Sequence, residues 1–201
     1  ATDLSTLPGD LATRARVPLI ETQAAVPTTR TVEDRGMVVH TASPVGQGGN
    51  RGILVGGILL NRNLGFIDTI NALVYLNAAT GGDRQGTATL FLEDVRVSTN
   101  VRLFEDVRAL GTRVSAVVRG KVLDDGKTWL DRAFVVNDWY ISGYTPIVDV
   151  DNKRVGILYA GFLETPFRSD LWSAILALIL LLLLLLALSM LLAFYSAKSI
   201  F

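Results

Sequence analysis

An arginine, an amide, a carboxylate and three hydroxyl side chains follow one another closely in the C-terminal half of the chain. A guanidinium binds a carboxylate through parallel hydrogen bonds, and amide and hydroxyl groups can donate further hydrogen bonds to the same anion. An arginine with aromatic and amide neighbours could therefore select a small anion. The candidate binding residues are Arg132, Asn137, Asp138, Tyr140, Ser142 and Tyr144.

Two β-rich runs, 129–136 and 139–148, carry these residues, and the Asn-Asp pair between them predicts a hairpin turn. Alternate side chains of a strand share a face, so the second run is predicted to have two different faces. One face carries Tyr140, Ser142 and Tyr144, and the other carries Trp139 and Ile141. The tyrosine row is the better candidate for a pocket wall. The alternative is that the tyrosines fill a core with their hydroxyls paired and that Asn-Asp only forms the turn.

A second polar row has a side chain at every other position: Arg96, Ser98, Asn100 and Arg102. Polar residues at this spacing are typical of the solvent face of an antiparallel strand, and that is the interpretation we favour. The single histidine, His40, is expected to be structural rather than catalytic.

The composition excludes several classes of site. The chain has no cysteine and one histidine, so a thiol nucleophile and a zinc site are excluded. The loop 46–52 lacks the Lys-Ser/Thr pair of a phosphate-binding loop, and residues 149–160 lack the glycine and the glutamate of a calcium loop. With 19 basic and 19 acidic residues and no long basic run, nucleic acid is not an expected partner. We expect neither enzyme activity nor a cofactor.

The stretch 171–195 is long and apolar enough to cross a membrane. It holds 25 residues without a charge, and about 20 apolar residues in a helix span the hydrocarbon core. Aromatic rings favour the membrane interface, which fits Trp172 near one end and Phe194 and Tyr195 near the other. Lys198 follows the span, but the flanking charges are too few to orient the helix. The lipid bilayer is therefore an expected partner.

Further β-rich runs in the chain come in pairs separated by turn residues. The runs 37–42 and 53–60 flank a glycine-rich loop, and the runs 87–92 and 95–101 flank an acidic pair. The run 155–163 is the last predicted strand. Strands joined as hairpins predict an antiparallel sheet.

Two helices are predicted among these strands. Asn63 is a candidate cap for a helix whose apolar stripe would be Phe66, Ile67, Ile70, Leu73 and Val74. A short helix is predicted over 115–123. An antiparallel sheet with helices packed on it makes the fold class α+β.

An internal repeat is visible in the sequence. The segment GILVGGIL at 52–59 matches GILYAGFL at 156–163, at an offset of 104 residues. Upstream, MVVHTASPV at 37–45 matches WYISGYTPI at 139–147, at an offset of 102. Each copy has a strand, a proline, a turn and a Gly-Ile-Leu strand, so we interpret the two as copies of one hairpin.

Three sequence blocks resemble a known family: GTATLFLEDVRVSTNVR, GTRVSAVV and WLDRAFVVNDWYISGYTPIVDVDNKRVGILYAGFLETPF. They are similar to the extracytoplasmic Cache sensor domain of bacterial histidine kinases and chemoreceptors, in its double-Cache form. The resemblance covers about residues 26–167. It implies a PAS-like antiparallel sheet with flanking helices, a pocket for a small ligand over the second sheet, and a periplasmic position on the bacterial inner membrane. In such a pocket the candidate residues would select a small anion.

The resemblance also implies a division of the chain. Residues 1–62 would be the remnant of a first Cache module, 63–168 a second module, 169–197 the transmembrane helix and 198–201 a cytoplasmic stub. Family members begin with a membrane helix and a long dimerisation helix, so we interpret this sequence as N-terminally truncated.

Two functions are then expected. The first is an accessory or structural subunit of a larger membrane complex, such as an energy-transducing or photosynthetic assembly, with other membrane-protein subunits as partners. The alternative is the input module of a two-component or chemotaxis receptor that binds a small organic acid or amino acid and signals through the membrane helix.

Overall fold

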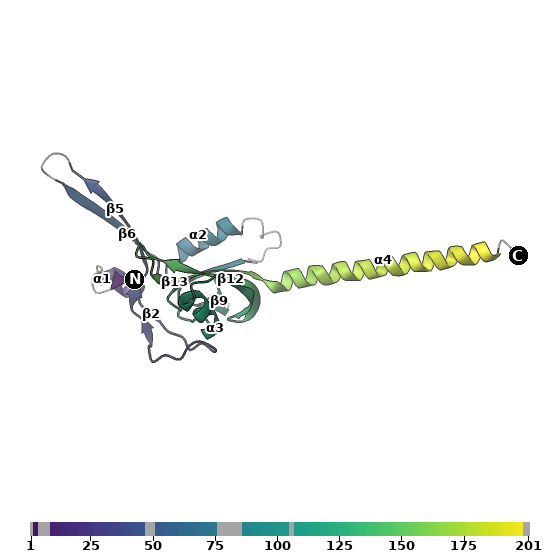
Figure 1. The fold of residues 1–201 in the computed structure, drawn as a ribbon, viewed down its shortest axis with the longest axis horizontal. Helices are drawn as coiled ribbons and strands as arrows, with labels where there is room; N and C mark the ends of the chain where they lie inside the picture. The colour runs from purple at the N-terminus through teal and green to yellow at the C-terminus, as the bar shows by residue number, and fades with distance from the viewer. Residues whose placement is uncertain (1, 4–8, 47–50, 76–85, 105–106, 199–201) are drawn as a thin grey trace. The chain divides into compact units, whose positions relative to one another are not determined.

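The computed structural model describes residues 2–3, 9–46, 51–75, 86–104 and 107–198 (Figure 1). The chain divides into two compact units, Ala1–Leu163 and Glu164–Phe201. The first unit holds the sheets and the short helices, and the second is a single long helix.

A five-stranded antiparallel sheet organises the first unit, in the order β11-β12-β13-β7-β8. The predicted hairpins over 87–101 and 129–148 are confirmed, as is the last strand. The bounds of the strands are β7 Gly86–Leu92, β8 Val95–Thr99, β11 Trp129–Val135, β12 Asp138–Val148 and β13 Arg154–Leu163. The fold is therefore the mixed, PAS-like class that the sequence predicts.

Both faces of the sheet are covered, which gives the unit two apolar cores. The first core gathers Phe91, Val118, Tyr144 and Tyr159 with their neighbours, on the face that carries the short helix after Ser115. The second core gathers Val17, Met37, Ile67 and Leu90 on the other face. Strand β7 is buried along its whole length because its alternate side chains enter the two cores.

Two helices pack on the sheet. Helix α2, Leu64–Val74, begins as predicted, because the Asn63 side chain accepts a hydrogen bond from Phe66 N at 3.1 Å. The predicted apolar stripe is partly wrong. Its member Ile67 is buried, but Phe66, Leu73 and Val74 are exposed, and the second buried residue of the helix is Asn71.

The second predicted helix is present with a change of pitch. Ser115 caps α3, Ala116–Arg119, and the chain then continues as the π-helix η2, Gly120–Asp124. Two short strands, β9 Arg102–Phe104 and β10 Val107–Arg108, precede it and pair with each other.

The N-terminal segment consists of short pieces that pair with one another. Helix α1 is Gly9–Ala15. Strand β1, Thr2–Asp3, pairs with β4, Arg35–Gly36, and β2, Val17–Pro18, pairs with β3, Val32–Glu33. The loop between β2 and β3, residues 19–31, reaches the wall of the cavity described below.

Each of the two copies of the sequence repeat forms a hairpin. Strand β5, Val38–Val45, pairs with β6, Gly52–Leu59, as a two-stranded sheet of its own. This two-stranded sheet is called the ribbon below. Strand β5 contains Pro44 and extends three residues further toward the C-terminus than the strand predicted at 37–42. The apolar side chains of the ribbon are mostly exposed, whereas β12 and β13 lie inside the five-stranded sheet.

Helix α4, Glu164–Lys198, forms the second unit. Its stretch Leu171–Ser196 has a mean hydropathy of 3.3, which is long and apolar enough to cross a membrane. Trp172, Phe194 and Tyr195 lie on it where the sequence analysis expects interface residues, and Lys198 is the last residue of the helix.

Candidate ligand-binding cavity

A cavity of about 570 Å³ lies beside the first core. Strand β8 contributes Arg96 to its wall, strand β12 contributes Tyr144, and α3 contributes Val118. The edge strand β11 supplies residues from Trp129 to Val135, and the loop after β2 supplies residues 20–24. The volume is within the range of pockets that hold small molecules.

Arg96 is the most unusual residue of the wall. It is 4% exposed, and its Nε and Nη1 atoms are buried without a hydrogen-bond partner in the described part of the chain. Its guanidinium carbon lies 5.1 Å from the centre of the Phe91 ring, a cation–π contact. Burial lowers the pKa of Arg96, but a guanidinium stays protonated in proteins, so the cavity wall carries an incompletely paired positive charge.

The sequence interpretation of the Arg96 row as a solvent face was wrong, because β8 is buried on both of its faces, and a β-bulge also divides the row between them. Phe91 pairs with Arg96 and Leu90 with Ser98, so Val97 is an extra residue in β8 and the alternation breaks there. Arg96 turns to the first core, whereas Ser98 is fully buried and donates a hydrogen bond to Asn63 O at 3.0 Å. Only Arg102 is exposed as expected.

Tyrosines surround the guanidinium. Tyr140, Tyr144 and Tyr159 interact electrostatically with Arg96. Burial raises the pKa of Tyr140 to about 12 and also raises the pKa of Tyr144 and of Tyr159. All three hydroxyls are therefore neutral near pH 7, when a hydroxyl can still donate a hydrogen bond. The three tyrosines thus bring no negative charge to Arg96, and the cavity lining also contains the carboxylate of Glu21.

The structure distributes the predicted site residues over three places. Tyr140, Ser142 and Tyr144 are buried on one face of β12 and Trp139 and Ile141 are exposed on the other, as the strand period predicts. Of the six candidates, Arg132 and Tyr144 line the cavity. The contact of the candidates with a ligand stays a prediction.

The other candidates are set apart from the cavity wall. Tyr140 and Ser142 share the face of Tyr144, and Asn137 and Asp138 lie at the hairpin end. Arg132 lies at the edge strand with its guanidinium carbon 4.0 Å from the centre of the Trp139 ring. Sequence reasoning missed Arg96 as a cavity residue, although within the described residues two of its polar atoms have no hydrogen-bond partner, and no signal in the sequence marks it.

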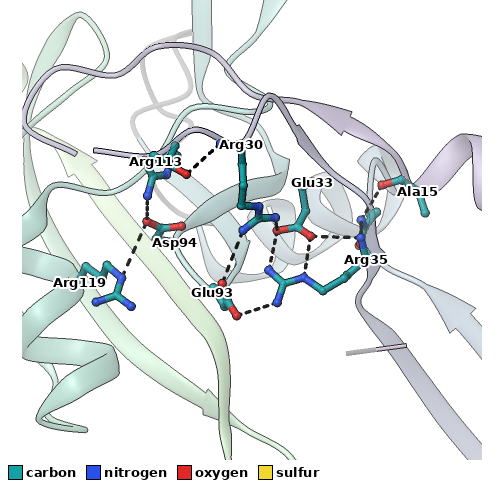
Figure 2. A network of polar contacts seen from close by, with 10 residues as sticks. Ala15, Arg30, Glu33, Arg35, Glu93, Asp94, Arg113 and Arg119 are labelled. Carbon is teal, nitrogen blue, oxygen red and sulfur yellow. Dashed lines mark hydrogen bonds and ion pairs between the residues drawn. The ribbon is translucent and has the colours of Figure 1, made fainter. Parts of the chain in front are cut away.

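Charged residues attach the N-terminal segment to the turn between β7 and β8 (Figure 2). Glu33 is fully buried and accepts hydrogen bonds from Arg35 and Arg30. Arg35 also donates to Glu93 at 2.7 Å. Burial alone would raise the pKa of Glu33, but the hydrogen bonds from the two arginines outweigh it and hold that pKa below its ordinary value.

A second set of charges stands next to the first (Figure 2). Asp94 is 4% exposed and lies 2.5 Å from Nη2 of Arg113, while Arg119 lies 3.9 Å away. Arg113 lines the cavity, so the ion pair with Asp94 fixes one part of the cavity wall to the turn at the end of the sheet. Within the described residues, no group of His, Cys, Asp and Glu could hold a metal ion.

Comparison with known families decides what this arrangement is. The family model described as single Cache domain 3 matches residues 58–174, more than half of the chain. The chain belongs to the Cache family. No curated protein and no solved structure matches it. The matching model is a single Cache domain, so a first Cache module over 1–62 stays a prediction.

The Cache domain places the cavity in context. Cache domains are generally sensory modules that bind ligands rather than catalysts. A Cache domain with one candidate membrane helix fits a membrane-anchored protein whose domain lies outside the cytoplasm. In this Cache domain the cavity and the buried charge of Arg96 lie on the same face of the sheet.

Proposed function

We propose that this protein is the sensory input module of a membrane receptor and that it binds a small carboxylate anion at Arg96. The observation that carries the proposal is the guanidinium of Arg96, which is buried in a cavity wall with two nitrogen atoms that lack partners. Removing a charge from water without pairing it costs several kcal/mol. An anion in the cavity would supply the missing partner.

The cavity lining supports an anion with an apolar body. Trp129, Val118 and Tyr144 offer apolar and aromatic surface beside the charge. Small-molecule sites are mostly apolar with a few polar groups that fix the orientation of the ligand. An aliphatic or aromatic monocarboxylate matches this lining. Arg132 lies at the edge strand with its guanidinium on the ring of Trp139, on the other face of the sheet, so it is not the primary contact for the anion.

The membrane helix supplies the route by which binding would be reported. Strand β13 ends at Leu163 and α4 begins at the next residue, so no linker residues separate them. A ligand shifts a conformational equilibrium only if it binds the two states with different affinity. We place the Cache domain in the periplasm of a bacterial cell, with α4 crossing the inner membrane and Lys198 on the cytoplasmic side.

A second candidate is an accessory subunit of a larger membrane complex. The observation that favours it is the hairpin β5–β6, which exposes Ile53, Leu54 and Val55 by 73%, 65% and 62%. Exposed apolar patches of this kind commonly mark contacts between proteins. Other membrane-protein subunits would then be the partners. The accessory role and the sensory role use different surfaces, so one does not exclude the other.

The anion site is tested by calorimetry on the full chain in lipid nanodiscs. Acetate, butyrate, benzoate and succinate are titrated, with acetamide and benzamide as neutral controls of the same shape. We expect at least one carboxylate to bind and the amides to fail. Arg96→Met should lower the affinity about ten- to hundredfold, because a charge-assisted hydrogen bond contributes about 1.5–3 kcal/mol.

Two further variants sharpen this experiment. Arg132→Met, also at the cavity, should change the affinity for the monocarboxylates much less than Arg96→Met does. Arg96→Met should fold at least as stably as the unmodified chain, since an apolar residue replaces a buried charge without a partner. A carboxylate that binds Arg96→Met with unchanged affinity, or amides that bind as well as the acids, would refute the proposal.

A further inference from the structure

We propose that residues 20–26, here called the strap, form a movable wall of the cavity that must release before a ligand can reach Arg96. The inference rests on the proposed function of the cavity. Its starting point is burial: Nε and Nη1 of Arg96 are buried, so an anion cannot bind both atoms while every wall stays in place. One wall has to move, and the walls differ in how they are attached to the domain.

The other walls are parts of the sheet and its core. Strand β8 is buried along its whole length, and β11 pairs with β12 along its whole length. Helix α3 is capped by Ser115 and packs Val118 into the first core. Moving any of these elements would open the core of the Cache domain.

The strap is attached differently. It lines the cavity with residues 20–24, and none of its residues belongs to either core. Four hydrogen bonds from its residues 20, 22, 24 and 26 reach the neighbouring wall: Ile20 N to Gly111 O, Arg113 N to Thr22 Oγ1, Ala116 N to Ala24 O and Arg113 Nη1 to Val26 O. These bonds can break without any change in the five-stranded sheet.

Both ends of the strap stay fixed when it opens. Strands β2 and β3 pair with each other, and Leu19 N donates to Thr31 O at 2.8 Å. The salt bridges of Glu33 with Arg30 and Arg35 hold the same end of the loop to Glu93 (Figure 2). The ends of the loop can therefore stay in place while the strap between them moves, as in a hinge motion.

Arg113 is the latch that holds the strap closed. Its backbone N–H donates to Thr22 Oγ1 at 3.1 Å and its side chain donates to Val26 O. The same side chain forms the ion pair with Asp94, which fixes its position. The strap therefore closes onto a residue that is itself tied to the turn between β7 and β8.

The closed strap also holds backbone strain. Ala24 has a φ of 65°, in the left-handed region that favours glycine, and it lies in a turn closed by Ala25 N to Thr22 O at 3.2 Å. Opening the strap would relieve this strain. The hydrogen bonds to the wall and the strain at Ala24 therefore act in opposite directions on the same equilibrium.

The test measures how fast a thiol inside the cavity reacts, and it needs no ligand. The chain has no cysteine, so Val118→Cys in the full chain in nanodiscs places a single thiol on the cavity wall. Its rate of labelling by a small anionic methanethiosulfonate reports opening. Thr22→Val removes the acceptor for Arg113 N with little change of shape, and we expect labelling to become roughly fivefold faster.

Two more variants give the test its direction. Asp94→Asn frees Arg113 without changing the cavity lining, and it should also accelerate labelling. Ala24→Gly relieves the strain of the closed turn, and it should slow labelling several-fold. Val97→Cys, fully buried in the second core, is the matched control for general loosening of the domain. None of the three strap variants should change its rate.

If the variants accelerate labelling equally at positions 118 and 97, the proposal of a movable strap is refuted. It is also refuted if none of the three variants changes the labelling rate at position 118. If Val118→Cys does not fold, hydrogen exchange of the Ala116 amide in the unmodified chain and in Thr22→Val replaces it, with amides of β13 as the control. If no carboxylate binds but the labelling rate at position 118 changes in the variants as expected, the proposed anion site is refuted and the proposal of a movable strap is retained.

Discussion

The hairpins β5–β6 and β12–β13 pair their strands in the same register. His40 faces Gly57 as Ser142 faces Gly161, with the two pairs 102 and 104 residues apart as in the sequence repeat. The register also agrees at both ends of the hairpins. At one end Val38 pairs with Leu59 and Tyr140 with Leu163, and at the other end Val45 pairs with Gly52 and Ile147 with Gly156.

Their surroundings differ completely. Strand β11 covers the free edge of β12 and β7 covers the free edge of β13, while the described residues place no strand on either edge of β5–β6. Ile157 is 0% exposed and its counterpart Ile53 is 73% exposed. The comparison teaches that the pairing register of a hairpin depends on its local sequence, whereas the burial of its side chains depends on the strands and helices that surround it. Substitutions at equivalent positions of the two hairpins test the effect of burial separately from the effect of local sequence.

The largest effect is expected at the matched isoleucines. Ile157→Ala removes a fully buried side chain and should lower the free energy of unfolding by about 2–5 kcal/mol. Ile53→Ala removes a mostly exposed side chain and should change it by less than about 0.5 kcal/mol. Urea titration of the full chain in detergent micelles measures both. A large loss at Ile53 would mean that β5–β6 is covered in solution, for example by a second copy of the chain.

The matched glycines should show a smaller difference. A Cβ at Gly156 would lie 2.1 Å from Phe91 O and 2.8 Å from the Met37 side chain, so Gly156→Ala forces β13 away from β7. We expect a loss of about 1–3 kcal/mol by the same titration. A Cβ at Gly52 would meet only the Val45 side chain at 3.7 Å, an ordinary contact, so Gly52→Ala should be tolerated. Equal losses would contradict the assignment of β5–β6 as an uncovered ribbon.

The smallest effect is a dependence of stability on alkaline pH through Tyr140 of β12. Tyr140 corresponds to Val38 in the repeat, and burial raises the pKa of Tyr140 to about 12 from an ordinary 10.0. The folded state therefore holds the phenol proton more tightly than the unfolded chain does. The resulting stability is complete below pH 10 and is lost as the pH rises from about 10 to about 12.

At pH 11 this loss amounts to about 1.4 kcal/mol, since pH 11 lies one unit above the unfolded pKa of 10 and one pKa unit corresponds to about 1.4 kcal/mol. Tyr140→Phe should flatten the fall of stability between pH 9 and 11, measured by urea titration at each pH. Val38→Tyr, on the ribbon, is the matched control and should add no such slope. An unchanged slope in Tyr140→Phe would show that other tyrosines carry the whole alkaline effect.

The parts of the fold that local sequence decides were predicted correctly. The Asn63 cap, the turn at Asn137 and the alternation along β12 depend on neighbours in the chain, and all three are confirmed. The apolar stripe of α2 was partly wrong because tertiary contacts choose the buried face, and Phe66 and Leu73 were left outside. Similarly, the apolar ribbon β5–β6 has the sequence of buried strands, and no pattern could show that its edges are open.

The candidate site was predicted only in part for a related reason. Tyr144 and Arg132 line the cavity, and the contact of any candidate with a ligand stays a prediction. Arg96 was misassigned because a polar row at every other position predicts a solvent face only where one face of the strand is uncovered, and β8 is buried on both faces. The strap was also beyond sequence reasoning, since it meets the cavity through contacts such as Ala116 N with Ala24 O, which lie far apart in the chain.

The pairing of β7 with β13 has a consequence for how the protein is made. Residue Tyr159 pairs with Thr89, and Gly156 pairs with Leu92, so the middle of the sheet joins the start and the end of the domain. Contacts between residues distant in sequence form late during folding. During translation the sheet cannot close until β13 has emerged, and α4 is the next segment to follow. Completion of the domain and delivery of the helix to the membrane therefore fall in the same short interval of synthesis.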